Sequence, residues 1–219
     1  MIRAVVFDFD GLILETEGPW MRAWMHVFEH FGVEVDELEL IAGVGTHFDA
    51  YEVLVARATT PLPSEREVRD MWRARGGELS AHLPVLPGVE QWLADAAGAG
   101  LPIAIASSSQ ETSVAPHLER HNLRGYFSHL ACWVEGVAPK PAPDLYLIAC
   151  AALGVSPADA LAIEDSANGV AAAKAAGMWC VAVPNQLTRQ LDLSAADVQL
   201  DSLAHATLAD VIATIRERA

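Results

Sequence analysis

Short apolar runs alternate with amphipathic stretches along most of the chain. Five apolar runs predict strands, and they lie at 3–10, 101–108, 129–134, 160–165 and 178–184. Between the later runs the periodicity predicts helices, at about 88–99, 110–121, 143–153 and 167–176. Strands that alternate with helices predict βαβ units, and strands that are apolar throughout predict a sheet covered on both faces. The predicted fold class is therefore α/β, with a Rossmann-like parallel sheet.

One long stretch interrupts this alternation. Residues 17–83 contain helical patterns only, at 19–31, about 47–58 and about 65–81, and the last begins with a capping-box pattern at Ser64–Glu67. The first strand is thus followed by a helical insertion before the second strand. We expect an α/β core domain formed by residues 1–15 and 84–219, and an inserted α-helical cap domain formed by residues 16–83.

Length and composition narrow the class of protein. The chain has 219 residues, of which 52% are hydrophobic, enough for one well-cored domain with an insertion. No apolar run approaches the roughly 18–20 residues of a membrane span, and no signal peptide is visible. The three cysteines, an odd number and widely spaced, suit buried thiols in a reducing compartment. We expect a cytoplasmic protein, and nothing in the sequence demands more than a monomer.

The charge balance excludes some partners and draws attention to others. The formal net charge is −15, from 29 acids against 14 bases, which argues against binding to nucleic acid or to anionic membranes. Only Lys140 and Lys174 are lysines. In a chain so poor in lysine, their positions are informative. We expect Lys174, on the helix that follows the fourth strand, to be solvated.

Polar residues gather where the predicted strands end. The carboxyl ends of the strands of an open parallel sheet form its ligand crevice. The residues at or just after four successive strands are Asp8 and Asp10, Ser107–Ser109, Lys140, and Glu164 and Asp165. Each group alone has an ordinary explanation as a turn, a helix cap or a solvated loop. Their joint occurrence at four strand ends favours a site.

The residue types suggest the chemistry of that site. Converging acids repel one another unless a cation lies among them, and oxygen ligands without His or Cys favour Mg²⁺. Serine and lysine beside such a metal suit a phosphoryl group. Gly11 permits a tight turn after Asp10, so that backbone N–H groups can cradle the same oxygens. One carboxylate can then attack phosphorus while the other transfers protons.

These residues, in this order, resemble the haloacid dehalogenase-like (HAD) hydrolase superfamily. The resemblance is to its phosphatase and β-phosphoglucomutase-like branch, which carries a helical cap after the first motif. DFDGLILETE resembles motif one, IASSS motif two, the lysine of VAPKPAPDLY motif three and IEDSANGVAAAKAAGM motif four. The similarity covers essentially the whole chain.

The resemblance implies roles for individual residues. Asp8 would be the nucleophile that forms an aspartyl-phosphate. Asp10 would be the general acid and base, and its backbone carbonyl would also bind Mg²⁺. Asp165, with Glu164 directly or through water, would complete the metal site. The phosphoryl group would be held by Ser107, Ser108, Lys140 and the backbone amides of Gly11 and Leu12.

Departures from the family pattern bear on the substrate. Glu15 stands where an aspartate is usual, and Trp20 stands where mutases carry a histidine. The cap loop at 41–47 lacks the Lys and Arg of mutases, and the cap lacks the lysine of phosphonate-cleaving members. Dehalogenases lack the second aspartate, which is present here as Asp10. Of the reactions in this family, simple phosphate-ester hydrolysis is the one that these departures leave in place.

We therefore expect a Mg²⁺-dependent phosphatase acting on a small phosphorylated metabolite, such as a sugar phosphate or phosphoglycolate. A β-phosphoglucomutase-type mutase is the alternative. A silent binding protein on the same fold is a further alternative, against which the intact Asp8, Asp10 and Lys140 argue. The cap has 12 acids against 6 arginines, so it is poorly matched to polyanions. Trp20 and His47 are its candidate specificity residues.

Overall fold

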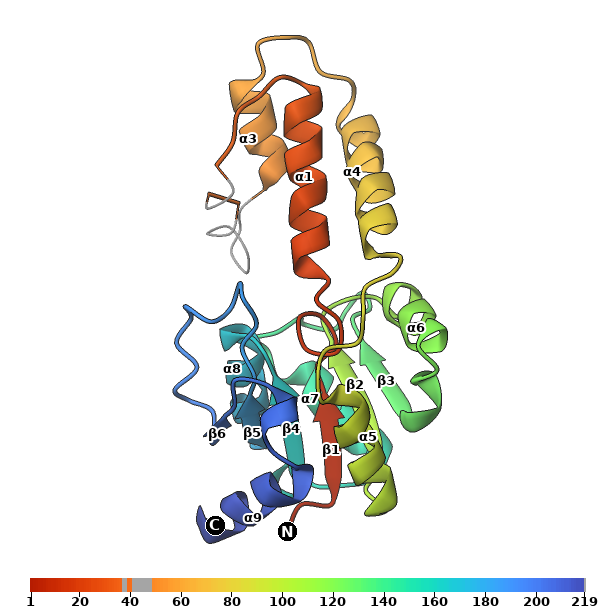
Figure 1. The fold of residues 1–219 in the computed structure, drawn as a ribbon, viewed down its shortest axis with the longest axis vertical. Coiled ribbons are helices and arrows are strands. Elements are labelled where there is room, and N and C mark those ends of the chain that lie inside the picture. The colour runs from red at the N-terminus through yellow and green to blue at the C-terminus, as the bar shows by residue number, and fades with distance from the viewer. Residues whose placement is uncertain (37–38, 41–48, 219) are drawn as a thin grey trace. The chain divides into compact units, whose positions relative to one another are not determined.

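The computed structural model describes residues 1–36, 39–40 and 49–218. The chain divides into two compact units (Figure 1). The first consists of Met1–Leu14 and Val85–Ala219, and the second of Glu15–Pro84. None of the helices in the described ranges is long and apolar enough to cross a membrane.

The first unit is built on a parallel sheet, as predicted. Within the described residues the sheet has six strands in the order β3-β2-β1-β4-β5-β6, and every neighbouring pair is parallel. The strands are β1 (Ala4–Phe7), β2 (Ile103–Ser107), β3 (His129–Cys132), β4 (Ala160–Glu164), β5 (Trp179–Ala182) and β6 (Val198–Gln199). The two-residue β6 was not predicted, because it is too short to show a hydrophobic period.

Helices cover both faces of this sheet, which confirms the predicted α/β layering. One face packs against α5 (Val89–Gly98), α6 (Glu111–Arg120) and α9 (Leu208–Arg218), and the other against α7 (Asp144–Leu153) and α8 (Ala167–Ala175). In the described part of this unit, three short 3-10 helices lie in the connections, η1 (Arg124–Tyr126), η2 (Pro157–Asp159) and η3 (Leu203–His205).

The two faces of the sheet differ in side-chain size. Large residues such as Phe7, Ile105 and Ile163 face α5, α6 and α9, whereas the face toward α7 and α8 is mainly alanine. Small side chains let helices approach a sheet closely, because less volume separates the backbones. On this alanine face the buried Tyr146 of α7 reaches the end of β4, where its hydroxyl contacts Glu164.

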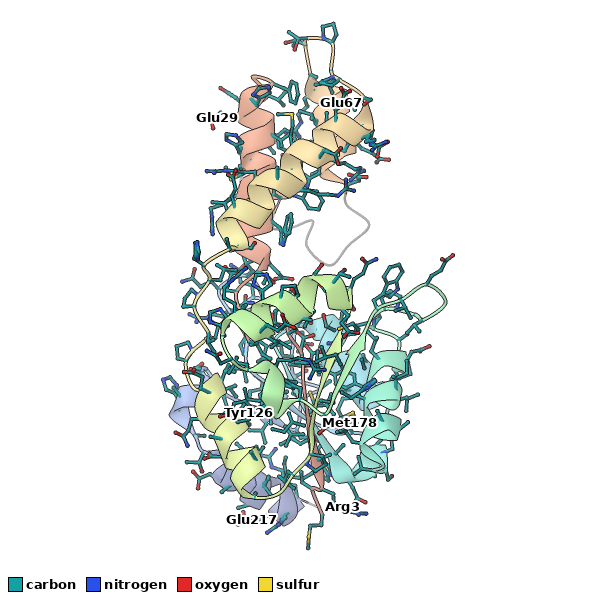
Figure 2. All side chains as sticks on the ribbon, turned by 90° about the vertical axis from the view of Figure 1, so that its right-hand side faces the viewer. Arg3, Glu29, Glu67, Tyr126, Met178 and Glu217 are labelled. Carbon is teal, nitrogen blue, oxygen red and sulfur yellow. The ribbon has the colours of Figure 1, made fainter. Side chains whose placement is uncertain are left out.

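The second unit is helical. It contains α1 (Glu17–His30), α3 (Ala50–Arg57) and α4 (Glu65–Ser80). Ser64 caps α4, and the Glu67 side chain accepts the Ser64 N–H in return, so the predicted capping box is present. Figure 2 labels Glu67 on α4. Residues 47 and 48 of the helix predicted at 47–58 lie outside the described residues.

Tryptophans hold α1 and α4 together. The centroid of the Trp72 ring lies 5.0 Å from that of Trp20 and 5.3 Å from that of Trp24. The Trp72 indole N–H also donates to the Trp20 carbonyl at 3.1 Å. Gly76 of α4 lies against the Trp20 ring, where a Cβ would overlap ring carbons. These tryptophans therefore pack α1 against α4, and Trp20, a candidate specificity residue, is one of them.

The two ends of the insertion meet at one point of the first unit. Leu14 and Val85 form an antiparallel bridge, and the Leu86 N–H donates to the Ile13 carbonyl at 2.9 Å. The chain thus leaves the first unit and returns to it at neighbouring positions.

Candidate active site

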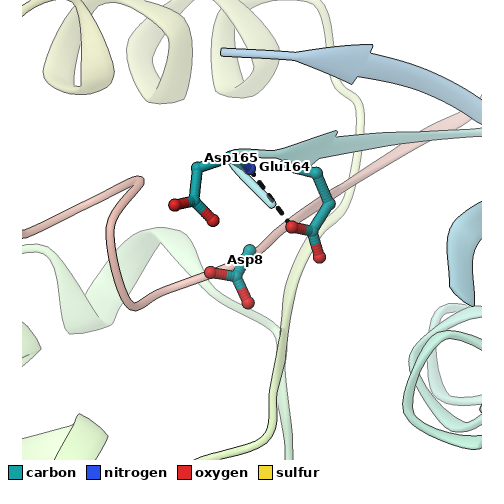
Figure 3. Close-up of side chains that lie close together, drawn as sticks. All are labelled: Asp8, Glu164 and Asp165. Atoms are coloured by element: carbon teal, nitrogen blue, oxygen red, sulfur yellow. Dashed lines mark hydrogen bonds between the residues drawn. The ribbon is translucent and has the colours of Figure 1, made fainter. Parts of the chain in front are cut away.

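Three carboxylates meet where β1 and β4 end. The parallel register places Phe7 beside Ile163, and the Asp8 N–H donates to the Ile163 carbonyl at 2.9 Å. Asp8, Glu164 and Asp165 each offer an oxygen within 4.8 Å of the others, and all three are buried (Figure 3). They form a group that could hold a metal ion.

Lys140, in the connection between β3 and α7, bridges two of these acids. Its ammonium donates to Asp8 Oδ1 and, at 2.5 Å, to Glu164 Oε1. Burial lowers the pKa of Lys140, but the neighbouring Asp8 and Glu164 carboxylates outweigh burial and hold that pKa above its ordinary value. Lys140 is therefore a fixed positive charge at the site.

The cluster carries more negative than positive charge. Burial raises the pKa of Asp8 well above its ordinary value; the Lys140 ammonium opposes this rise, and the charges of Glu164 and Asp10 add to it. Among the described residues, Lys140 is the one lysine in contact with these acids. A further cation would thus relieve repulsion between the carboxylates.

Glu164 is the most enclosed of the three acids. Its Oε1 accepts from the Tyr146 hydroxyl at 2.6 Å as well as from Lys140, and its Oε2 accepts from the Asp165 N–H at 3.2 Å and the Ser166 hydroxyl at 3.4 Å. Gly169, in the first turn of α8, leaves room for this carboxylate, which a Cβ would overlap. Burial and the Glu164 charge raise the pKa of Tyr146, so its phenol stays a donor. Sequence reasoning missed Tyr146.

The Asp10 carboxylate has different partners. Its Oδ2 accepts from the hydroxyls of Ser109 at 2.7 Å and Ser107 at 3.2 Å, at the end of β2. The Ser109 N–H also donates to the Ser107 hydroxyl at 3.0 Å, and the Ser108 hydroxyl accepts the Lys140 N–H at 3.3 Å. The structure thus brings together the ends of β1 and β2, and Ser109, to which the sequence analysis gave no role of its own, donates the shorter of the two hydrogen bonds to Asp10.

The backbone N–H groups of the turn after Asp10 are hydrogen-bonded within the turn itself. The Gly11 N–H donates to the Leu14 carbonyl at 2.8 Å, and the Leu12 N–H lies 3.4 Å from the Phe9 carbonyl. A phosphoryl oxygen would have to displace the Gly11 bond, whereas the long Leu12 contact is easily exchanged. The geometry therefore favours Leu12 over Gly11 as a phosphate donor.

The remaining predicted residues lie elsewhere. Trp20 belongs to the helical unit, and His47 lies outside the described residues. Lys174 was expected to be solvated, and this expectation is wrong. Its ammonium donates to Asp197 Oδ2 at 2.6 Å and to the Met178 carbonyl at 3.0 Å. Sequence periodicity cannot show this pairing, because Asp197 is brought to Lys174 only by the sheet.

The cysteines behave as expected from the sequence. Cys132, Cys150 and Cys180 are buried free thiols. Burial raises the pKa of Cys132 to about 12 and that of Cys150 to about 11, so these thiols stay protonated and unreactive.

The fold and the site together define a class of α/β enzymes whose site is built around carboxylates. The strand ends of a parallel sheet bring these carboxylates together with a buried lysine and with serines. Residues 5–183 match the family described as haloacid dehalogenase-like hydrolase, and the chain belongs to that family of enzymes. This confirms the resemblance read from the four motifs.

Relatives span nearly the whole chain. It is 39% identical over 211 residues to YhcW of Bacillus subtilis (strain 168), covering 95% of this chain and 96% of that protein. It is 35% identical over 215 residues to hexitol phosphatase B of Escherichia coli (strain K12), with 96% and 97% covered. The crystal structure of CbbY from Rhodobacter sphaeroides in complex with phosphate is similar with a TM-score of 0.80 at 31% identity, covering 95% and 98%.

Proposed function

We propose that this protein is a Mg²⁺-dependent phosphatase that hydrolyses a small phosphorylated metabolite, a sugar phosphate or a phosphoglycolate-like compound, through an aspartyl-phosphate intermediate. The observation that carries the proposal is the buried Asp8 carboxylate in contact with Lys140, beside Glu164 and Asp165. The similarity to hexitol phosphatase B supports a phosphate monoester as substrate.

The donor set fits Mg²⁺. It consists of carboxylate oxygens without sulfur or imidazole, and the charge balance at Asp8 calls for a further cation. We infer that Asp8, Asp165 and the backbone carbonyl of Asp10 hold the ion, as the family resemblance implies. Each Glu164 oxygen already accepts two hydrogen bonds, so Glu164 acts through water or by orienting its neighbours. When bound, Mg²⁺ would offset charge on the phosphoryl oxygens.

The protein's own residues carry the reaction. An Asp8 carboxylate oxygen attacks phosphorus, and the bond from phosphorus to the leaving oxygen breaks. Asp10 gives its proton to that leaving oxygen, then takes a proton from water. The resulting hydroxide attacks the phosphorus of the aspartyl-phosphate, releasing phosphate and restoring Asp8. Lys140, Ser107 and Ser108 bind phosphoryl oxygens through charge and hydroxyl donors.

The helical insertion is proposed to select the substrate. Residues 1–15 and 84–219 would supply the chemistry and residues 16–83 the cap, with Trp20 and His47 as contacts. Mutase chemistry is disfavoured because position 20 holds an indole packed against Gly76 and Trp72 instead of the histidine of mutases.

A screen of phosphorylated metabolites with Mg²⁺ tests this function. Wild type should release phosphate from at least one sugar phosphate or from phosphoglycolate, and a chelator should abolish release. Asp8→Asn and Asp10→Asn should each abolish turnover, because each lacks a reacting group. Asp201→Asn, at an exposed position, is the matched control and should turn over like wild type.

Other outcomes assign the alternatives. Release of no phosphate by wild type from any compound would overturn the phosphatase proposal. Chelator-insensitive release would overturn the metal assignment. Interconversion of sugar phosphates after priming with a bisphosphate would establish the mutase instead.

A further inference from the structure

The fifth strand end also contributes to the site. Asn185 lies in the loop that follows β5, and its side-chain amide donates to Asp165 Oδ2 at 2.8 Å and to the Gly11 carbonyl at 3.3 Å. Its Oδ1 accepts the N–H groups of Leu187 at 2.8 Å and Thr188 at 3.0 Å. This side chain thus links the end of β4 to the turn that follows β1.

Its partners fix the orientation of the Asn185 amide. A side-chain amide has two donor hydrogens and one acceptor oxygen, and all of them are used here. The reversed amide would turn its oxygen toward the Asp165 carboxylate and its NH₂ toward two backbone N–H groups. Both contacts would be repulsive, so only the observed orientation is stable.

The loop holds Asn185 in place before any ligand binds. The Asn185 N–H donates to the Thr188 hydroxyl at 3.0 Å, and Thr188 is buried. The Arg189 N–H donates to the Asn185 carbonyl at 3.0 Å. The turn from 185 to 188 therefore presents the amide as a preformed donor.

The Asn185 amide and the Asp165 carboxylate are packed closely against the backbone of Gly11. A Cβ on Gly11 would lie 2.6 Å from Asn185 Nδ2 and would overlap the Asp165 carboxylate. The amide, the carboxylate and the Gly11 backbone are thus in close contact. Rotation of the Asp165 carboxylate breaks its bond to Asn185.

We propose that Asn185 is a positioning residue of this site, which orients the Asp165 carboxylate for the cation and ties it to the turn after Asp10. The proposal rests on the proposed function, in which Asp165 holds Mg²⁺. A carboxylate offers about four acceptor sites on its two oxygens, so it can accept the amide hydrogen bond and also ligate a cation. Because its orientation is set in advance, binding does not have to order it.

The competing explanation is that Asn185 only closes its own turn. Asn185→Ser separates the two roles, because a serine hydroxyl can accept turn N–H groups but is too short to reach Asp165. Thr188→Val is the matched control: it removes the hydroxyl that accepts the Asn185 N–H and leaves the amide facing Asp165.

The test measures Mg²⁺ binding to the whole protein by isothermal titration calorimetry, without substrate. Asn185→Ser should weaken Mg²⁺ affinity by about 10- to 100-fold, the usual effect of losing a partner of a metal ligand. Thr188→Val should lower the unfolding temperature and weaken Mg²⁺ affinity less than Asn185→Ser does, because the Asn185 amide still faces Asp165. At saturating Mg²⁺, the KM for substrate should be the same in both variants and wild type.

Equal Mg²⁺ affinity in Asn185→Ser and wild type would overturn the positioning role and leave the proposed function standing. Equal weakening in Thr188→Val would assign the effect to the turn and overturn the role too. A wild-type protein that binds no Mg²⁺ would overturn the metal assignment of the proposed function, and the positioning role with it.

Discussion

Gly11 meets two requirements at one position. Its φ of +80° lies in the left-handed region, where a Cβ costs about 1–2 kcal/mol. Its missing side chain also leaves room for the Asp165 carboxylate and the Asn185 amide. A larger residue at position 11 would therefore strain the backbone and displace the site at the same time.

Gly177 allows these two effects to be measured separately. Its φ is +82°, yet a Cβ there would meet nothing within 4 Å. Gly177→Ala should lower the free energy of unfolding by about 1–2 kcal/mol in urea titrations and keep full Mg²⁺-dependent phosphate release. Gly11→Ala should lose more stability than Gly177→Ala, because its Cβ also overlaps the Asp165 carboxylate, and it should lose most of its turnover. Full activity in Gly11→Ala would show that the site tolerates displacement of Asp165.

Some residues of the site could be predicted from strand ends, and others could not. Asp8, Glu164 and Asp165 lie at or just after the ends of strands with clear apolar patterns, and Lys140 lies in the connection after another. A parallel sheet brings such ends together. Tyr146 lies within an apolar helix, where an aromatic residue is normally interpreted as part of the hydrophobic core. Only the folded structure shows that its hydroxyl donates a hydrogen bond to Glu164. Asn185 follows a strand that was predicted, but a lone amide after a proline reads as an ordinary turn.

At the scale of elements, the apolar runs predicted β1 to β5 but overestimated their lengths, and they missed the two-residue β6. The run at 3–10 includes both aspartates, whereas β1 ends at Phe7. The acids lie beyond the ladder, where the chain turns and their side chains reach other strand ends. Helix ends were predicted best where capping residues mark them, as at Ser64.

The α1–α4 contact gives a prediction with a neighbouring control. Gly76→Ala should destabilise the protein, because its Cβ overlaps the Trp20 ring and overpacking costs about 1–3 kcal/mol. Gly77→Ala, where a Cβ meets open space, should stabilise α4 by about 0.5–1 kcal/mol through helix propensity. Urea unfolding followed by circular dichroism compares the two. Equal effects would mean that Trp20 moves aside without cost.

The capping box of α4 should make stability depend on pH. Hydrogen bonds from the Ser64 side chain and backbone lower the pKa of Glu67 below its ordinary value. The ionised form is thus favoured by folding, so the stabilisation is complete above the ordinary pKa and is lost as pH falls through the lowered one.

The variant Glu67→Gln removes this titration. Wild type should unfold at a higher temperature than Glu67→Gln at about pH 7, and the difference should disappear near about pH 3. Glu65→Gln is the control, because Glu65 lies in the same first turn but does not bond to Ser64. A similar pH dependence in Glu65→Gln would assign the effect to the helix terminus in general.

At the scale of the whole molecule, the cluster of buried acids should link stability to the cation. Mg²⁺ at about 100 times its dissociation constant should stabilise wild type by about 2.7 kcal/mol. Asp165→Asn should lose most of this increment. Without Mg²⁺ it should unfold at or above the wild-type temperature, because one like charge is removed from the cluster.

Thermal unfolding with and without Mg²⁺ measures both effects, and Asp201→Asn should keep the full increment. Because the chain carries a net charge of −15, NaCl at matched ionic strength is needed as a second control. If NaCl stabilises wild type as much as Mg²⁺ does, general screening explains the result and the cluster is not a cation site.

The bridge between Leu14 and Val85 has a consequence for how such an enzyme can change. Both ends of the insertion are fastened to each other in the first unit, which alone supplies Asp8, Lys140, Glu164 and Asp165. Doubling the length of a flexible connection there costs only about 0.6 kcal/mol of closure entropy. Helical inserts of quite different size and sequence could therefore be exchanged at this junction, so one catalytic core could acquire new substrates by module replacement instead of by remodelling its own chemistry.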